Sequence, residues 1–242
     1  MTTTERTTTE RVSYELDGGV ARITMDDGKL NVFSPAMLRE LHAAFDRAER
    51  DEAIVVLTGR EGCFSAGFDL GVFAAGEPEL ALEMLRLGAT LVERLLGFAR
   101  PVVVACTGHA VAAGSFVALA ADVRIGVDGP FKLGLNEVRI GLTVPWFVIE
   151  LARYRLVGAQ FDRSVVGATM YTPKEAVAAG FLDSVVGADE LRAAGAQAAA
   201  ALAELDAAAH AATKLRARAG TLEAVRAAIE TELTAESLLG AP

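Results

Sequence analysis

The chain has 242 residues, of which 52% are hydrophobic, enough for one large domain or two small ones with a sizeable core. Acidic residues outnumber basic ones by 32 to 23, which gives a formal net charge of −9. This balance argues against nucleic acid or an anionic membrane as partner, since both require a basic face. It still allows a local basic patch for a small molecule that carries phosphate.

Cysteine and histidine usage indicates neither a disulfide nor a metal site. Cys63 and Cys106 lie in apolar, strand-like segments, which favours buried free thiols, and the three histidines are scattered. The longest apolar stretch, residues 110–121, is too short to cross a bilayer. The polar residues 1–11 predict a disordered leader, and with no signal peptide visible we expect a cytoplasmic location.

The first half of the chain alternates between short apolar runs typical of strands and longer segments with helical periodicity. Asp17-Gly18-Gly19 between two alternating runs predicts a hairpin, and Ser34-Pro35 is typical of the start of a helix. Strands separated by helices indicate the α/β class. The strands are expected over residues 12–16, 20–25, 54–58, 101–106 and 123–126, and the helices over residues 34–50, 80–96 and 114–121.

The composition changes from residue 189 onward, where alanine dominates and charges recur at helical spacing. This pattern predicts helices with breaks near Asp206 and Gly220. We therefore divide the chain after the leader into a core over residues 12–187 that holds the active site and a helical segment over residues 188–242. The alanines of that segment allow close packing within the chain or between subunits.

Glu137 is the first candidate for a catalytic residue. It is the only glutamate between Glu93 and Glu150, and the residues around it are mostly small or apolar. A lone acid in such surroundings is a surface residue, a structural hydrogen-bond acceptor, or a general base whose pKa is raised by desolvation. Other segments of the chain favour the last interpretation.

Two loop-to-helix junctions, residues 63–70 and 108–116, place small residues at the expected start of a helix. Such a start leaves backbone N–H groups free to bind a carbonyl oxygen or an anion. Two of these donors that converge on one oxygen would form an oxyanion hole. Each junction by itself is more often an ordinary turn.

Five segments in order resemble the crotonase family, the enoyl-CoA hydratase/isomerase superfamily. They are Gly-Lys-Leu-Asn at residues 28–31, Phe-Ser-Ala-Gly-Phe-Asp-Leu at 64–70, residues 108–122, Gly-Leu-Asn-Glu at 134–137 with Ile-Gly-Leu at 140–142, and residues 172–183. The resemblance covers about residues 12 to 240. It implies a spiral of ββα units, a CoA thioester as substrate, no prosthetic group, and a homotrimer or hexamer built through the C-terminal helices.

The resemblance also implies roles for single residues. The amides of Phe68 and Ala113 would hold the thioester oxygen, and the carbonyl of Ala66 would lie near the adenine of CoA. Lys29 and Lys214 are candidates for the CoA phosphates, although each is more often a plain surface lysine.

Hydratases of this family use two glutamates. In this chain Phe116 occupies the position of one of them, and Glu137 matches the other. A shift of a 3-enoyl to a 2-enoyl double bond needs one base, and the Gly-Leu-Asn-Glu segment resembles the single-glutamate Δ3,Δ2-enoyl-CoA isomerases. Phe116 and Trp146 are expected to line the acyl pocket, and Glu150 is a reserve acid.

Isomerisation is therefore the first expected function. An enoyl-CoA hydratase, or another reaction through a thioester enolate, is the second. A non-catalytic acyl-CoA-binding protein is the third. Asp69 is expected to cap a helix and His109 to be structural, and the sequence does not indicate the acyl chain length.

Overall fold

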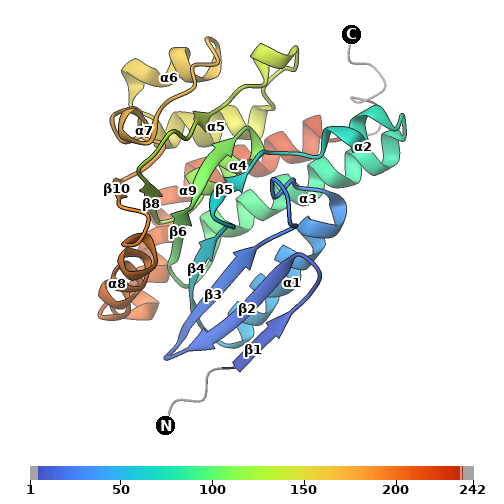
Figure 1. Cartoon of the computed structure of the whole chain (residues 1–242). Coiled ribbons are helices and arrows are strands. Elements are labelled where there is room, and N and C mark those ends of the chain that lie inside the picture. Colours follow the sequence, from blue (N-terminus) through green and yellow to red (C-terminus); the bar gives the residue numbers. More distant parts are fainter. Residues whose placement is uncertain (1–4, 235, 237–242) are drawn as a thin grey trace.

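The computed structural model describes residues 5–234 and residue 236. In this part of the chain a main sheet has the order β1-β2-β3-β4-β6-β8-β10 (Figure 1), and a smaller sheet has the order β5-β7-β9. The strands are β1 Glu5–Thr8, β2 Val12–Asp17, β3 Val20–Met25, β4 Ile54–Thr58, β5 Gly62–Ser65, β6 Val102–Cys106, β7 Gly108–Val111, β8 Val123–Val127, β9 Leu133–Gly134 and β10 Ser184–Val186. The helices are α1 Pro35–Arg50, α2 Leu70–Ala74, α3 Pro78–Gly97, α4 Ala113–Leu119, the 3-10 helix η1 Val138–Ile140, α5 Trp146–Arg155, α6 Gly158–Val165, α7 Pro173–Ala179, α8 Leu191–Ala203 and α9 Ala207–Glu232.

The two sheets are built from a repeated pair of strands. Strands β4, β6 and β8 lie parallel in the main sheet, and each is followed in the chain by one strand of the small parallel sheet, β5, β7 or β9. Helical segments connect one pair to the next. This arrangement confirms the expected α/β spiral of ββα units.

Helices cover both faces of the main sheet. Alternate residues of its central strands therefore enter different hydrophobic clusters. Val55 and Leu57 of β4 pack in the cluster that includes α1 and α3, whereas Ile54 and Val56 pack with Leu191 of α8. Helix α8 contacts β4, β6 and β8. The central strands β4 and β6 are therefore buried on both sides, as their continuous apolar sequences predict.

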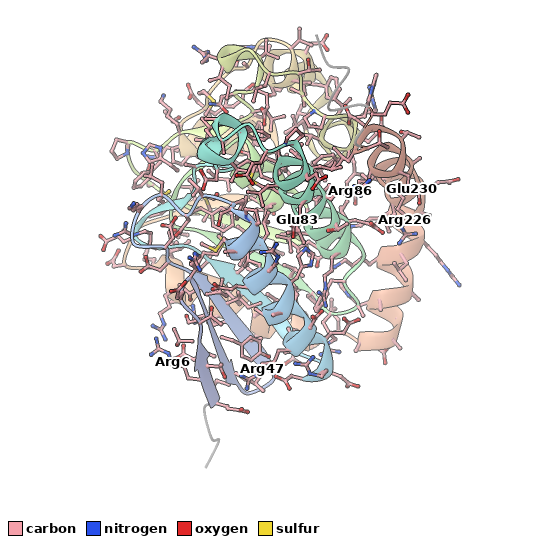
Figure 2. The ribbon with its side chains drawn as sticks, turned by 90° about the vertical axis from the view of Figure 1, so that its right-hand side faces the viewer. Arg6, Arg47, Glu83, Arg86, Arg226 and Glu230 are labelled. Atoms are coloured by element: carbon pink, nitrogen blue, oxygen red, sulfur yellow. The ribbon has the colours of Figure 1, made fainter. Side chains whose placement is uncertain are left out.

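The C-terminal helix α9 lies against α3 and α5 of the same chain. Figure 2 shows Arg226 and Glu230 of α9 beside Glu83 and Arg86 of α3. Arg226 Nε lies 2.6 Å from Glu93 Oε1, and Arg86 Nε donates a hydrogen bond to the Leu233 carbonyl at 2.7 Å. Both C-terminal helices thus pack within the chain, and their expected role in assembly stays a prediction.

Several elements confirm the sequence predictions. Gly18 and Gly19 form the hairpin turn with φ of 56° and 80°, a conformation that glycine adopts without strain. Ser34 Oγ accepts a hydrogen bond from Met37 N at 3.2 Å and caps α1. Cys63 and Cys106 are buried free thiols. No helix of the described residues is long and apolar enough to span a membrane.

Two expectations differ from the structure. Residues 5–8 of the expected disordered leader form β1, which pairs antiparallel with β2, while residues 1–4 lie outside the described residues. Arg47 of α1 holds β1 through an ion pair with Glu5 at 2.7 Å; Figure 2 shows Arg47 close to this strand. The predicted break at Gly220 is wrong, because α9 continues through this glycine to Glu232.

Candidate active site

Three loops meet at one edge of the small sheet and bring the expected site residues together. Strands β5, β7 and β9 are parallel, so their carboxyl ends lie at the same edge. Phe68 lies in the loop after β5, Ala113 begins α4 after β7, and Glu137 follows β9. Phe68 and Glu137, which are 69 positions apart in the sequence, thus lie at the same edge of the small sheet.

Glycines permit close contact between the first two loops. Gly67 has φ +97°, and a Cβ added there would lie 3.0 Å from Ala112 Cβ and 3.3 Å from Ala113 N. A Cβ on Gly114 would lie 2.5 Å from the carbonyl oxygen of Ser65. Larger side chains at either position would force the loops apart, so glycine is needed there.

The amides of Phe68 and Ala113 donate none of the hydrogen bonds found among the described residues. Their neighbours are fixed instead: Phe33 N donates to the Gly67 carbonyl at 2.8 Å, and Ala112 N donates to the Gly134 carbonyl at 2.9 Å. Ala112 has φ 49° and ψ −120°, a backbone conformation that favours glycine. Two free amides on adjoining, fixed loops are suited to bind one carbonyl oxygen.

Glu137 is buried beside these loops, with 6% of its surface exposed. Burial raises the pKa of its carboxyl from 4.5 to about 7. Its Oε2 atom is buried and has no hydrogen-bond partner among the described residues. The backbone is held from the other side, since Ile140 N and Leu142 N donate to the Glu137 carbonyl at 3.0 and 2.9 Å. A fixed carboxylate with one unpaired oxygen and a pKa near neutrality can act as a general base.

Aromatic rings form an apolar wall next to these groups. Phe116 of α4 is 1% exposed, and its ring centroid lies 5.9 Å from that of Phe68 and 5.7 Å from that of Phe147. A Cβ on Gly88 of α3 would lie 2.5 Å from the Phe68 ring, so α3 packs directly against this ring. The wall reduces the access of water to this side of the loops.

The structure brings Lys29 and Ala66 together, as expected for two parts of one CoA site. Ala66 N donates to the carbonyl of Leu30 at 3.0 Å, next to the exposed Lys29. Arg60 donates to the Lys29 carbonyl at 2.7 Å and adds a cation that sequence reasoning missed. The only signal for Arg60 is its place two residues after a buried strand.

Lys214 and Trp146 are placed differently from these groups. The Lys214 side chain is 3% exposed and its Nζ lies 2.6 Å from Asp122 Oδ2, an ion pair at the opposite end of the main sheet. Trp146 begins α5 and is 59% exposed, and its backbone amide donates to Glu232 Oε2 at 2.8 Å. Their expected contacts with CoA and with the acyl chain stay predictions.

The remaining candidates have local partners. Asp69 Oδ1 accepts a hydrogen bond from Gly71 N at 2.9 Å, which confirms the helix cap. His109 Nδ1 lies 3.1 Å from Lys132 N, in agreement with a structural role. Glu150 Oε2 lies 3.9 Å from Arg153 Nε on the same helix.

Sequence reasoning also missed two polar residues that shape the site. Asn31 is fully buried, and its Nδ2 lies within 3.2 Å of the carbonyl oxygens of Met25, Cys63 and Phe64. These contacts join the segment between β3 and α1 to β5. Asn136, next to Glu137, has a buried Oδ1 atom without a partner among the described residues. The Gly-Lys-Leu-Asn and Gly-Leu-Asn-Glu segments contain both residues, but their contacts depend on the fold.

Comparisons with known proteins agree with this geometry. A family model described as enoyl-CoA hydratase/isomerase matches residues 15–238. Mouse mitochondrial enoyl-CoA delta isomerase 1 is 30% identical over 75% of the chain, and this match spans 65% of the mouse protein, just under two thirds of its length. A probable enoyl-CoA hydratase, EchA17 of Mycobacterium avium, is 33% identical over 72% of the chain and 68% of its own length.

The crystal structure of an enoyl-CoA hydratase/isomerase family protein from Pseudomonas syringae is also similar. It superposes with a TM-score of 0.90 and 48% identity over 93% of this chain and 97% of that chain. The family model, the shared fold and the three loops at the edge of the small sheet agree with one another. The chain belongs to the enoyl-CoA hydratase/isomerase, or crotonase, family.

Proposed function

We propose that this protein is an enoyl-CoA isomerase, which shifts the double bond of a 3-enoyl-CoA to the 2-position. The observation that carries this proposal is the pair formed by Glu137 and Phe116. One buried carboxylate of raised pKa lies next to the loops, and the position of the second family glutamate holds a buried phenylalanine ring.

The reaction begins when the thioester oxygen binds to the amides of Phe68 and Ala113. Glu137 removes a proton from C2, and the electron pair of that C–H bond moves toward the thioester, which becomes an enolate held by the two amides. The enolate then re-forms its carbonyl, the double bond moves from C3–C4 to C2–C3, and C4 takes the proton from Glu137. The carboxylate is restored and no other reactant is used.

The pKa of Glu137 suits this cycle. A base with a pKa near 7 is substantially ionised at neutral pH and, once protonated, returns its proton readily. The CoA part of the substrate would lie along Lys29 and Ala66, with Arg60 as a further cation. The acyl chain would lie against Phe116, with Trp146 at the outer side of the same pocket.

Hydration of a 2-enoyl-CoA is the second candidate, favoured by the similarity to a probable hydratase from Mycobacterium avium. Hydration needs one group to orient water and one to exchange a proton with the α-carbon. In this chain Glu137 would have to serve both purposes, because Phe116 supplies no polar atom. Binding of acyl-CoA without turnover is the third candidate.

Initial rates with two substrates test the proposal. We expect a 3-enoyl-CoA to be converted to the conjugated 2-enoyl-CoA, and we expect hydration of the 2-enoyl-CoA to be at least about 100-fold slower, the scale of one acid–base catalyst. Hydration as fast as isomerisation would favour the hydratase. Tight binding of both compounds without turnover would favour the acyl-CoA-binding protein.

A further inference from the structure

We propose that a cavity between the first half of α9 and the end of α5 is a second binding site, which takes a small organic phosphate and is separate from the CoA site. Lys214 lines this cavity, and in this proposal it binds the small phosphate instead of the CoA phosphates expected from the sequence. The cavity has a volume of about 450 Å³. This volume is within the range of small-molecule sites, roughly 300–1,000 Å³. Its lining residues include Asp122, Tyr154, Leu205, His210, Lys214 and Arg218.

The cavity lies far from the oxyanion loops. Asp122 directly precedes β8, and its Oδ2 accepts a hydrogen bond from Val102 N at the start of β6. The loop that leads to Ala113 leaves the other end of β6, and five strand residues span about 16 Å. The cavity and the active site are thus at opposite ends of the parallel strands.

Cations are in excess around the cavity, although the whole chain has a formal charge of −9. Lys214 and Arg218 share the single carboxylate of Asp122, at 2.6 and 2.7 Å. Arg155, which lies outside the cavity lining and donates to the carbonyls of Leu119 and Ala121, adds a third charge close enough to act on both. The other lining carboxylate, Asp206, accepts a hydrogen bond from Ala209 N and caps α9.

Two nitrogen atoms next to this cluster have no hydrogen-bond partner among the described residues. They are Nδ1 of His210, a residue of the cavity lining, and Nε of Arg100, a residue outside the lining. The charges of Arg100, Lys214 and Arg218 all act on His210. Both atoms are buried, and a buried polar group without a partner is unfavourable. A phosphate offers several acceptor oxygens and two negative charges, so it matches the cations Lys214 and Arg218 of the cavity lining.

The rest of the cavity fits an organic group rather than a free ion. Besides the charged residues it is lined by the Tyr154 ring and by apolar side chains, among them Leu205 and two alanines of α9. The Tyr154 ring lies beside two guanidinium groups, with Arg155 Cζ 4.9 Å and Arg218 Cζ 6.0 Å from its centroid. A phosphate monoester with a flat or apolar body would use both parts of the cavity.

The pKa values of the cations agree with an anionic ligand. Burial lowers the pKa of Lys214 to about 8 and that of Arg155 to about 10, against the opposing effect of Asp122. A bound dianion would stabilise the charged form of both groups. It would also raise the pKa of His210, which burial lowers in the free protein.

Calorimetric titration with phenyl phosphate and with inorganic phosphate, at a constant ionic strength set by sodium chloride, tests the site. We expect phenyl phosphate to bind once per chain, and inorganic phosphate about tenfold more weakly. Arg100→Gln and His210→Ala should each weaken binding of phenyl phosphate at least about fivefold. Arg192→Ala, which removes an exposed cation on α8, should leave binding unchanged.

Two measurements on the unmodified protein complete the test. NMR titration should show that phenyl phosphate raises the pKa of His210, and saturating CoA should leave the affinity for phenyl phosphate unchanged. The absence of saturable binding, or an unchanged pKa of His210, would overturn the proposal. Displacement of phenyl phosphate by CoA would assign the cavity to the CoA site and would also overturn it.

Discussion

Glu137 shows how burial of a single side chain supports the chemistry of the site and reduces stability. Its carboxyl is buried, and its Oε2 atom has no hydrogen-bond partner in the described part of the chain. The charged form is therefore disfavoured, which raises the pKa to about 7. The same desolvation that makes the carboxylate more basic lowers the free energy of unfolding when the group is ionised.

The raised pKa of Glu137 predicts opposite pH effects on activity and stability. The value of kcat/KM should rise with pH and reach a plateau above about pH 7, because the reaction requires the carboxylate. The folded state retains the proton at higher pH than the unfolded state. Stability should therefore fall between about pH 4.5 and 7, by up to about 3 kcal/mol. Denaturant unfolding at pH 5 and pH 8 measures this loss, and a Glu137→Gln control should lack it.

Gly67 predicts how sensitive the oxyanion hole is to loop spacing. The Gly67→Ala variant should lower kcat by at least about 100-fold, the effect of losing one hole donor, because the new Cβ would push against Ala113 N. Gly76→Ala is a matched control, since Gly76 also has a positive φ, +70°, but has open space around it. Equal kcat values in the two variants would show that the contact between the loops does not position the amides.

Asp122 links three elements that the sequence alone does not connect. One oxygen accepts hydrogen bonds from Val102 N of β6 and Lys214 of α9, and the other accepts one from Arg218 of α9. The N-terminal half of α9 is thus attached to the edge of the sheet where β6 and β8 begin. Helix α9 also contacts α5 and α3, and therefore supports the aromatic wall of the site from behind.

Replacement of Asp122 by asparagine should destabilise the fold by about 3–5 kcal/mol, because it leaves Lys214 and Arg218 buried without a counter-charge. Chemical denaturation gives this value directly. Asp46→Asn is a suitable control, since Asp46 forms an exposed ion pair with Arg94 and should cost about 1 kcal/mol or less. A similar small loss in both variants would show that the Asp122 cluster contributes little to stability.

The elements differ in how far the sequence predicts them. The hairpin at Gly18-Gly19 and the start of α1 at Ser34 follow from local turn and capping chemistry. Strands β7 and β9 were missed because they have four and two residues, too few to show a period. Gly220 was wrongly expected to end a helix, since a lone exposed glycine costs only about 1 kcal/mol and packing of α9 overrides it.

The positions of the candidate site residues can be predicted from the sequence where they depend on backbone groups and on sequence motifs. Phe68, Ala113 and Glu137 lie at one edge of the small sheet, as the resemblance implies. The contacts of Lys214 were not predictable, because its partner Asp122 is 92 residues away and only the fold brings the two together. For the same reason the unpaired oxygen of Asn136 has no signal in the sequence.

At the scale of the whole molecule, both C-terminal helices pack against their own chain, with α8 on the main sheet and α9 on α3 and α5. Their outer faces still carry many exposed alanines and the exposed Leu215. We expect these faces to contact other copies in a trimer or a dimer of trimers. Removal of the helices would uncover the sheet, so truncation would unfold the chain rather than release a monomer.

Light scattering of the intact protein measures the assembly directly. The expected mass is three or six times that of the 25.3 kDa chain, at micromolar concentration. A chain that stays monomeric and active at this concentration would contradict the expected trimer. The C-terminal helices would then have only the intramolecular role that the structure shows.

The turnover of a 3-enoyl-CoA by the Glu137→Gln variant tests the central claim most directly. Glutamine keeps the size of the side chain but cannot accept the proton, so the fold and the affinity for CoA should persist. The rate of isomerisation should fall by at least about 100-fold, the scale of general base catalysis. A folded Glu137→Gln protein that isomerises the substrate at nearly the unmodified rate would contradict the account.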